Sequence, residues 1–170
     1  MSEPTAISSD RPLTVVECGG QRTAVATRDF APGETILRLT GVFVSRPTRY
    51  SVQVSEVGHI EPPDLPPGHP DHATYAWRFL NHSCEPNATF RGETLVAIAP
   101  IEKGEEVRFH YAATEYDVAA PFDCRCGSAR CIGRVRGYRH LSASERQRIA
   151  RFAQEHVLDA ALRDEREAAR

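Results

Sequence analysis

Four cysteines in this chain have the types and the spacing of a metal site. Three of them fall within eight residues and the fourth lies forty positions earlier; they are Cys84, Cys124, Cys126 and Cys131. Four thiolates in a tetrahedron are a common ligand set for structural zinc. Because no fourth ligand stands close to the short cluster, the zinc would bind Cys84 and clamp two distant parts of the chain together. The remaining cysteine, Cys18, is expected to be a small buried hydrophobic residue.

Two alternatives to a four-thiolate site exist. The cysteines could be reduced, buried thiols, but the stretch around the cluster is polar and holds Arg125 and Arg130, which makes it a poor core. Alternatively, His82 or His110 could replace one thiolate as a ligand. Four thiolates already complete the site, so zinc held by the cysteines is the preferred interpretation.

The composition fits one globular domain with a terminal appendage. The chain has 170 residues, of which 41% are hydrophobic, and a net charge of −2, which disfavours a general nucleic-acid binder. Residues 1–10 are polar and carry no apolar leader, so we expect an intracellular protein, most simply a cytoplasmic one, whose clustered thiols bind metal. The longest apolar run, residues 95–101, is too short to span a membrane, and we expect no membrane partner.

Short apolar and β-branched runs separated by turns predict a mostly β domain. The expected strands cover residues 13–17, 22–27, 35–39, 42–44, 50–54, 94–99 and 106–111. The proline-rich stretch 61–70 predicts an irregular surface loop, and residues 73–80 fit a short helix or a strand. Residues 112–137 are expected to be irregular and to need metal for order. One C-terminal helix is predicted, beginning at a capping box formed by Ser142 and Glu145.

Two further motifs resemble the signatures of a known family. Residues 78–87 read R-F-L-N-H-S-C-E-P-N, and residues 104–111 read G-E-E-V-R-F-H-Y. Both are similar to the signatures of SET-domain protein lysine methyltransferases. The cysteine pattern C-x-C-x-x-x-x-C-x-G, which ends at Gly133, resembles the post-SET zinc segment of the same family. Three motifs in the family's order and spacing make the resemblance specific.

The resemblance implies a mainly β fold in which small β-sheets surround a pseudoknot, with a post-SET zinc loop and a C-terminal α-helix. It divides the chain into a flexible N-terminal arm at 1–12, a SET domain at 13–111, a post-SET zinc segment at 112–138 and a C-terminal helix at 139–170. In this family, cofactor and substrate enter from opposite faces and meet in a narrow channel.

The implied reaction is methyl transfer from S-adenosyl-methionine to the ε-amine of a lysine in a protein or peptide, a histone-like substrate included. The attacking amine must be neutral, which only about 10⁻³ of free lysine is at neutral pH, so an apolar channel would have to lower its pKa. Tyr111 occupies the family's catalytic position, where its hydroxyl orients the reacting groups. Phe109 lines the lysine channel, and a phenylalanine there implies di- or trimethylation. Nucleic acid would be met only through a DNA-bound protein substrate.

The same resemblance assigns a set of residues to the cofactor. They are Asn81, His82, Arg78, Tyr50, Arg22, Thr23 and Phe122. Asn81 and His82 match residues that hold the methionyl end and the adenine, although both are also ordinary turn and core residues. The family's early G-x-G loop is replaced by residues 21–23, and Gly19-Gly20 lie just upstream, where a shift of register would let them serve. Position 110 is histidine where the family often has aspartate.

Two other functions remain compatible with these residues. A catalytically silent SET-like module would bind a peptide in the lysine groove, and the replaced glycine loop motivates this alternative. A zinc-stabilised nucleic-acid binder would use the arginines around the cysteine cluster. Cofactor binding separates the silent module from an enzyme, and salt-dependent DNA binding would identify the nucleic-acid binder.

Overall fold

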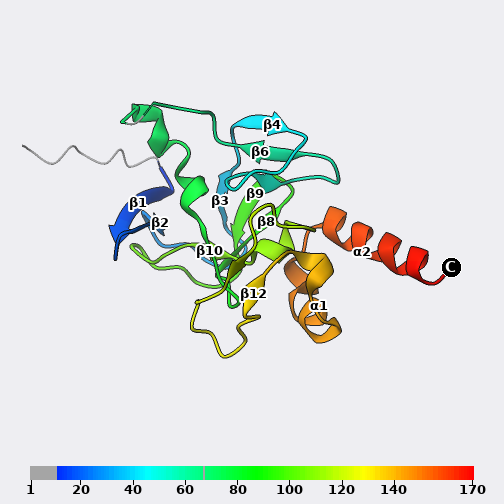
Figure 1. Ribbon diagram of the computed structural model, residues 1–170. Coiled ribbons are helices and arrows are strands. Elements are labelled where there is room, and N and C mark those ends of the chain that lie inside the picture. The colour runs from blue at the N-terminus through cyan, green and yellow to red at the C-terminus, as the bar shows by residue number, and fades with distance from the viewer. Residues whose placement is uncertain (1–10, 67) are drawn as a thin grey trace, which may run out of the picture.

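A computed structural model describes residues 11–66 and 68–170 of the chain, so the predicted arm at 1–12 lies almost wholly outside the described residues. Small β-sheets and short turns form the body, and two helices follow at the C-terminal end (Figure 1). The strands are β1 (Leu13–Cys18), β2 (Gln21–Ala26), β3 (Thr35–Arg38), β4 (Val42–Val44), β5 (Val52–Gln53), β6 (His59–Glu61), β7 (Asn81–His82), β8 (Ala88–Arg91), β9 (Thr94–Ala97), β10 (Arg108–Phe109), β11 (Phe122–Asp123) and β12 (Arg134–Val135). The helices are α1 (Ala143–Ile149) and α2 (Glu155–Ala168), and the 3₁₀ turns are η1 (Pro70–Ala73), η2 (Ala76–Phe79), η3 (Tyr111–Ala113), η4 (Tyr138–His140) and η5 (Ala150–Phe152).

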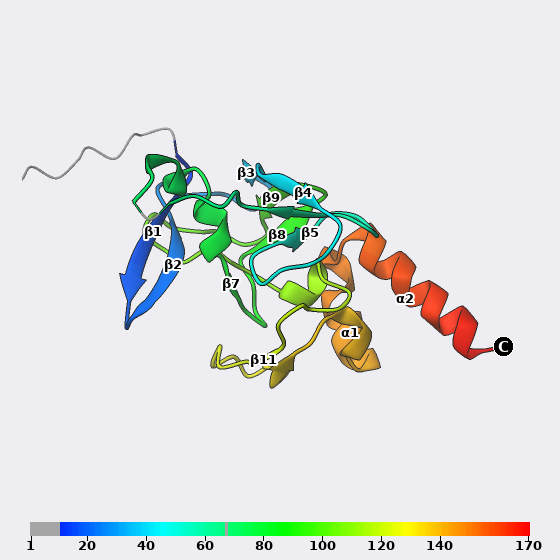
Figure 2. The same cartoon turned by 45° about the horizontal axis from the view of Figure 1, so that its top comes forward.

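The described strands pair into several separate small sheets, as the fold prediction requires. The sheets have the strand orders β1-β2, β3-β9-β8, β4-β6-β5, β7-β10 and β11-β12. Strands β7 and β10 run parallel, whereas the other pairs are antiparallel. Seen with its top turned forward, the molecule shows the β1-β2 hairpin and the β4-β6-β5 sheet as distinct units around the centre (Figure 2). The mainly β architecture is therefore confirmed.

The two glycines upstream of the replaced G-x-G loop form the turn of the first hairpin. Gly19 and Gly20 connect β1 to β2 with φ angles of 60° and 78°, which only glycine adopts without strain. A two-residue turn with both φ values positive matches the twist of a hairpin. Arg22 and Thr23 therefore lie on β2, opposite Glu17 and Val16 of β1.

The main core surrounds the β3-β9-β8 sheet and includes side chains of the β1-β2 and β4-β6-β5 sheets. Alternate residues of β9 are buried, whereas the first three residues of β8 are all buried, and Phe90 and Leu95 are fully enclosed in this core. Trp77 of η2 is also buried in this core, with 2% of its surface exposed. The predicted strand at 94–99 thus forms β9 at Thr94–Ala97, with one face buried.

The parallel pair β7-β10 brings the two signature segments side by side. Asn81 lies opposite Arg108 and His82 opposite Phe109. Beyond the ladder, the backbone N–H of Ser83 donates to the carbonyl oxygen of Phe109 at 3.0 Å. We call residues 81–87 together with residues 105–111 the knot, because the predicted pseudoknot requires these two segments to lie together.

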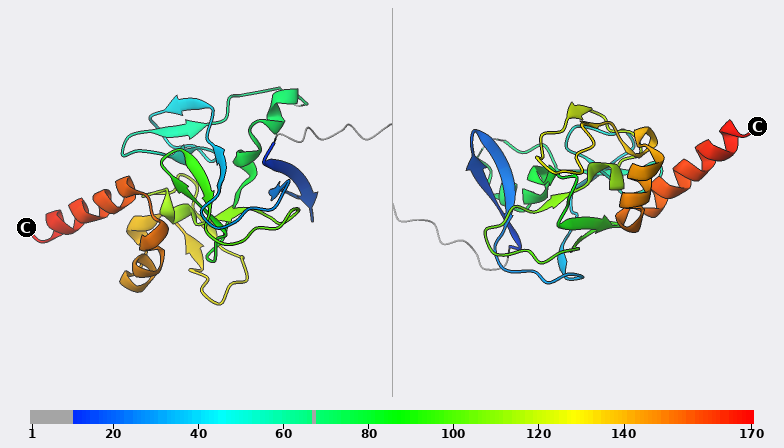
Figure 3. Two further views of the ribbon diagram at one scale, coloured as in Figure 1. Left: turned by 180° about the vertical axis from the view of Figure 1, so that it is seen from behind. Right: turned by 90° about the horizontal axis from the view of Figure 1, so that it is seen from below.

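The C-terminal region differs from the prediction of one helix. The capping box at Ser142 is present, but α1 ends at Ile149, and η5 separates it from α2. Phe152 is buried at the break in a second core cluster, and its carbonyl oxygen accepts a hydrogen bond from Thr89 Oγ1 at 2.9 Å. Burial of Phe152 against the body thus overrides the helical pattern. Beyond the break, α2 projects from the body in both views of Figure 3.

Two local expectations also need correction. Cys18 is exposed rather than buried, because it closes β1 at the tip of the hairpin. The predicted strand 106–111 is a strand only at Arg108–Phe109, and Tyr111 begins the turn η3. Among residues 11–66 and 68–170, no helix is long and apolar enough to cross a membrane.

Candidate active site and metal centre

Tyr111 lies at the point where the knot turns into η3. Its hydroxyl donates to the carbonyl oxygen of Leu80 at 2.8 Å, so the phenol is fixed against the first signature segment. Burial, reinforced by the negative charge of Glu115, raises the pKa of Tyr111 above its ordinary value. The phenol therefore remains protonated at neutral pH and acts as a hydrogen-bond donor and acceptor rather than as a base.

Aromatic rings surround Tyr111. The ring centroid of Phe109 lies 4.8 Å away and that of Phe122 lies 5.8 Å away. Phe109 also packs edge-on against Phe90 at 5.0 Å, which holds its ring in place from the core side. Tyr111 and Phe109 lie two positions apart at the end of β10, so the pair forms one aromatic wall. An apolar wall of this kind suits a channel that disfavours a charged amine.

Thr23 and Asn81 meet on the β2 side of the knot. The Asn81 Nδ2 group donates to Thr23 Oγ1 at 3.1 Å and to Glu106 Oε1 at 2.8 Å. Thr23 Oγ1 donates to the same Glu106 oxygen. Sequence reasoning missed Glu106, although it is the second glutamate of the G-E-E motif and could have been found there.

Arg22, Arg78 and Tyr50 form a second group, connected through Phe79. The guanidinium carbon of Arg78 lies 4.5 Å from the centre of the Tyr50 ring and 5.2 Å from that of Phe79. Arg22 covers the ring of Phe79 at 5.0 Å. These are cation–π distances, and they bring the exposed Arg22 and the half-buried Arg78 onto the same aromatic ring. Phe122 is not part of this group and lies beside His82 and Tyr111 instead.

The four cysteines converge as the zinc prediction requires. Their sulfur atoms all lie within 4.8 Å of one another, and the Sγ atoms of Cys84 and Cys124 are 3.9 Å apart. Zinc with Zn–S bonds of about 2.3 Å spaces tetrahedral sulfurs about 3.8 Å apart. Cys84 is buried, Cys131 is exposed, and none of the described cysteines forms a disulfide. The donor set therefore fits a tetrahedral zinc ion.

The local electrostatics also favour a cation among the thiols. Burial raises the pKa of Cys84, and it raises the pKa of Cys124 to about 11. Burial acts in the same direction on Cys126, but hydrogen bonds from the backbone of Cys84 and Ser128 outweigh it and lower its pKa to about 7. Thiols held this close cannot all ionise without a positive partner, and zinc supplies that partner when it binds.

His82 connects the knot to the thiol cluster through both ring nitrogens. Its Nδ1 accepts from the backbone N–H of Tyr111 at 3.1 Å, and its Nε2 lies 3.3 Å from the Sγ atom of Cys84. Burial, and secondarily the nearby His110, lowers the pKa of His82 to about 3. The pKa of His110 is also lowered by burial, to about 4. His82, Cys84 and His110 form a second group of possible ligand atoms that shares Cys84 with the thiol cluster.

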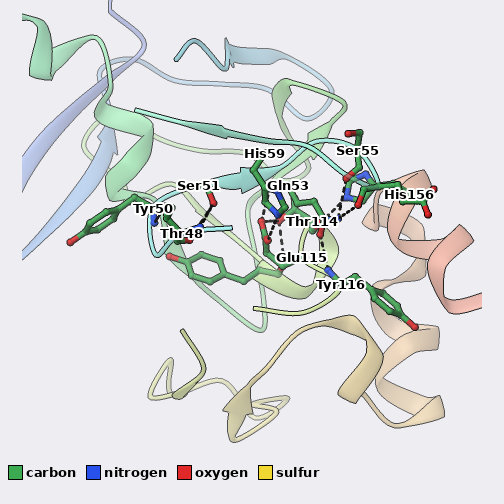
Figure 4. A network of polar contacts seen from close by, with 12 residues as sticks. Thr48, Tyr50, Ser51, Gln53, Ser55, His59, Thr114, Glu115, Tyr116 and His156 are labelled. Carbon is green, nitrogen blue, oxygen red and sulfur yellow. Dashed lines mark hydrogen bonds and ion pairs between the residues drawn. The ribbon is translucent and has the colours of Figure 1, made fainter. Parts of the chain in front are cut away.

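A buried polar network, shown in Figure 4, joins the β4-β6-β5 sheet to the turn after Tyr111. Glu115 Oε1 accepts from the backbone N–H of Gln53 at 2.7 Å, and Glu115 Oε2 lies 3.7 Å from His59 Nε2. The Gln53 side chain accepts in turn from the backbone N–H of Tyr116 at 3.1 Å. Sequence reasoning missed this network because its members are more than fifty positions apart and carry no local motif.

Comparisons with known proteins agree with this geometry. The model of the SET domain family matches residues 21–112. Methyltransferase flvH of Aspergillus flavus is 36% identical over 85 residues, which cover 48% of this chain and 47% of that protein. Histone-lysine N-methyltransferase EHMT1 of Homo sapiens is 36% identical over 91 residues, which cover 46% of this chain and 6% of that protein. The chain thus spans about half the length of the first relative and a small fraction of the second.

A solved structure shares the fold. The crystal structure of KRYPTONITE in complex with mCHG DNA and SAH superposes with a TM-score of 0.53 at 19% sequence identity. The match covers 72% of this chain and 28% of that one. Because the family model spans more than half of the chain and includes both signature segments, the protein belongs to the SET domain family.

Proposed function

We propose that this protein is an S-adenosyl-methionine-dependent protein lysine N-methyltransferase. The observation that carries the proposal is the position of Tyr111. Its hydroxyl is fixed to Leu80 beside the rings of Phe109 and Phe122, where the two signature segments pair. Relatives named as methyltransferases and histone-lysine methyltransferases support the same reaction class.

S-adenosyl-methionine, when bound, supplies a methyl group on a sulfonium that is already a good leaving group. The residues of this chain then have to position and desolvate the reacting groups. We propose that the aromatic wall of Phe109 and Tyr111 favours the neutral lysine amine. The protonated Tyr111 hydroxyl would orient that amine and would not remove its proton.

Phe109 is proposed to set the final methylation state. A phenylalanine presents no hydroxyl to bind the amine, so the product can rotate and receive a second or third methyl group. Phe109→Tyr would add that hydroxyl beside Tyr111 and should shift the products toward monomethyl-lysine. Mass spectrometry of the product peptide reads out this change directly.

The predicted cofactor residues support a binding site on the β2 side of the knot. The amide of Asn81, the hydroxyl of Thr23 and the carboxylate of Glu106 form one hydrogen-bonded set. Arg22 and Arg78 are proposed to face the cofactor carboxylate, because both guanidinium groups lie over the ring of Phe79, near Thr23 and Asn81 in the sequence. Phe122 is proposed to cover the adenine.

The four cysteines are proposed to hold a structural zinc ion. In this assignment residues 13–111 are the SET domain, and the metal orders the segment 112–138 beside it. The substrate is proposed to be a protein or peptide that presents lysine, and DNA would be approached only through such a substrate. A histone substrate would require access to chromatin, whereas another protein would fit a cytoplasmic location.

The first test is a calorimetric titration of S-adenosyl-methionine into zinc-loaded protein. We expect one-to-one binding with a dissociation constant of about 10⁻⁶ to 10⁻⁵ M, which corresponds to about 7–8 kcal/mol. Asn81→Ala should weaken this binding. Absence of binding at about 1 mM, with and without an acceptor peptide, would contradict the proposal and favour the silent peptide-binding module.

A further inference from the structure

The imidazole of His82 lies between the backbone of Tyr111 and the sulfur atom of Cys84. Its backbone belongs to β7 and pairs with β10, and its side chain makes separate contacts. The ring is buried, and the rings of His110, Tyr111 and Phe122 surround it edge-on at centroid distances of 4.7, 5.4 and 6.0 Å. The ring orientation is therefore fixed by packing as well as by hydrogen bonds.

The hydrogen bonds determine which nitrogen carries the proton. A backbone N–H can only donate, so the Nδ1 atom that faces the Tyr111 N–H at 3.1 Å must offer a lone pair. In the neutral ring the proton then resides on Nε2. That N–H points at the Cys84 Sγ atom, 3.3 Å away, and acts as its donor.

The same sulfur receives a second N–H group. The backbone N–H of Ile132 lies 3.4 Å from Cys84 Sγ. Two donors directed at one sulfur suit a thiolate better than a thiol, because hydrogen bonds to a charged acceptor are the stronger ones. Such partners of metal ligands orient the ligand and tune its affinity for the metal.

We propose that His82 is a positioning residue that couples the four-cysteine metal site to Tyr111. Its Nε2–H holds the Cys84 thiolate, and its Nδ1 holds the backbone N–H at the start of η3. Loading of the metal site would thereby strengthen the contact that fixes the turn carrying the Tyr111 ring. The metal half of this proposal stands on the thiol geometry alone, whereas the Tyr111 half rests on the proposed methyltransferase function.

Two substitutions separate the two halves. In His82→Asn the side-chain oxygen takes the place of Nδ1 and the donor toward Cys84 is lost. In His82→Gln the amide N–H₂ reaches the place of Nε2 and the acceptor for Tyr111 is lost. Each variant therefore keeps one contact and serves as the control for the other.

Metal affinity is measured by competition with a chromophoric chelator. We expect His82→Asn to weaken zinc binding about 10- to 100-fold and His82→Gln to weaken it less than about 3-fold. The wavelength of the thiolate-to-metal charge-transfer band of the Co²⁺-loaded protein should shift in His82→Asn. It should be unchanged in His82→Gln. These readouts need no catalytic activity, so they decide the metal half even if the protein transfers no methyl group.

Turnover of the zinc-saturated protein is the complementary readout. We expect His82→Gln to lower kcat about 10-fold, and more than His82→Asn does, when both variants are measured at a saturating concentration of S-adenosyl-methionine. A role in packing alone would make both variants lose metal affinity and turnover in parallel, and that result would overturn the coupling. Inactivity of the unmodified protein would instead refute the proposed function.

Nitrogen-15 spectra of the unmodified, zinc-loaded protein guard against variants that fail to fold. We expect the chemical shift of His82 Nδ1 to be that of an unprotonated nitrogen. The chemical shift of Nε2 should be that of a protonated one. In ¹¹³Cd-loaded protein the Nε2–H proton should show scalar coupling to the metal through Cys84. The opposite tautomer, with the proton on Nδ1, would contradict the proposal.

Discussion

The knot and the thiol loop, residues 118–134, lie next to each other but are held in different ways. In the knot, buried side chains and backbone groups of the two segments satisfy one another; Asn87 alone accepts from the Arg108 N–H and donates to the Glu106 carbonyl. The thiol loop is largely exposed, and its regular structure is the short antiparallel pair β11-β12. Its sulfur atoms converge without a covalent link. Hydrogen bonds thus fix Tyr111 at the knot, whereas no covalent bond joins the converging sulfur atoms of the loop.

The largest expected effect comes from removing the metal. It should disorder the thiol loop and leave the knot intact. Cys126→Ser should lose zinc and with it the order of the thiol loop, because structural zinc contributes about 10–16 kcal/mol of apparent binding energy in zinc-finger peptides. Amide hydrogen exchange should rise in residues 118–134 while the knot amides stay protected. S-adenosyl-methionine binding, measured by calorimetry, should also be lost.

Cys18→Ser is the matched control for that variant, because Cys18 is exposed at the hairpin and distant from the cluster. It should keep zinc and the exchange pattern of residues 118–134. A Cys126→Ser protein that binds cofactor without metal, with an ordered loop, would show that the loop does not depend on zinc.

The next effect tests whether the knot positions a reacting group. Tyr111→Phe removes one hydroxyl, its bond to Leu80 and its proposed contact with the substrate, and we expect kcat to fall about 10²- to 10³-fold. Zinc content and cofactor affinity should stay within a few-fold of the parent protein. Steady-state methyl transfer with separate binding titrations measures both; unchanged turnover would leave Tyr111 with a packing role only.

A smaller effect tests the hydrogen bonds that hold the knot. Asn87→Ala leaves the Arg108 N–H and the Glu106 carbonyl without partners in a buried region, and we expect the free energy of unfolding to fall by about 2–4 kcal/mol. Urea unfolding of the zinc-loaded protein measures the loss. Thr48→Ala, which removes an exposed hydrogen bond to Glu61, should cost less than about 1 kcal/mol. Equal losses in the two variants would argue against the knot as a special point of stability.

The smallest expected effect concerns acid sensitivity outside the two regions, where α2 contacts the turn after Tyr111. Burial lowers the pKa of His156, whose Nε2–H donates to the Thr114 carbonyl at 2.8 Å. Below about pH 6.5 the unfolded chain takes up a proton that the folded chain refuses, so stability is lost as the pH falls from there toward the lowered pKa. His156→Gln keeps a donor and removes this loss, which partial exposure limits to less than about 1 kcal/mol.

Thermal unfolding of both proteins between pH 7 and pH 5, at equal zinc content, measures that difference. The thiolates protonate equally in the two proteins, so the loop contributes the same change to each. A constant difference across this range would mean that His156 does not titrate on unfolding.

The sequence by itself determined the features that short spacing controls. The cysteine pattern predicted that the four sulfur atoms converge, and they do, because a zinc site needs four donors whatever path the chain takes between them. The signature segments singled out Tyr111, Phe109 and Asn81 as candidates, and their roles stay predictions. A short apolar, β-branched run located β9, and the capping box located the start of α1, because both depend on neighbours within one turn or one strand.

The tertiary structure alone decided the contacts between distant residues. It divided the predicted C-terminal helix, since burying Phe152 and bonding its carbonyl to Thr89 outweighs local helical preference. It assembled the buried Glu115 network and turned the His82 ring between Tyr111 and Cys84. Such arrangements depend on which side chains share a desolvated space. Local spacing carries no information about that, because the space exists only once the chain has folded.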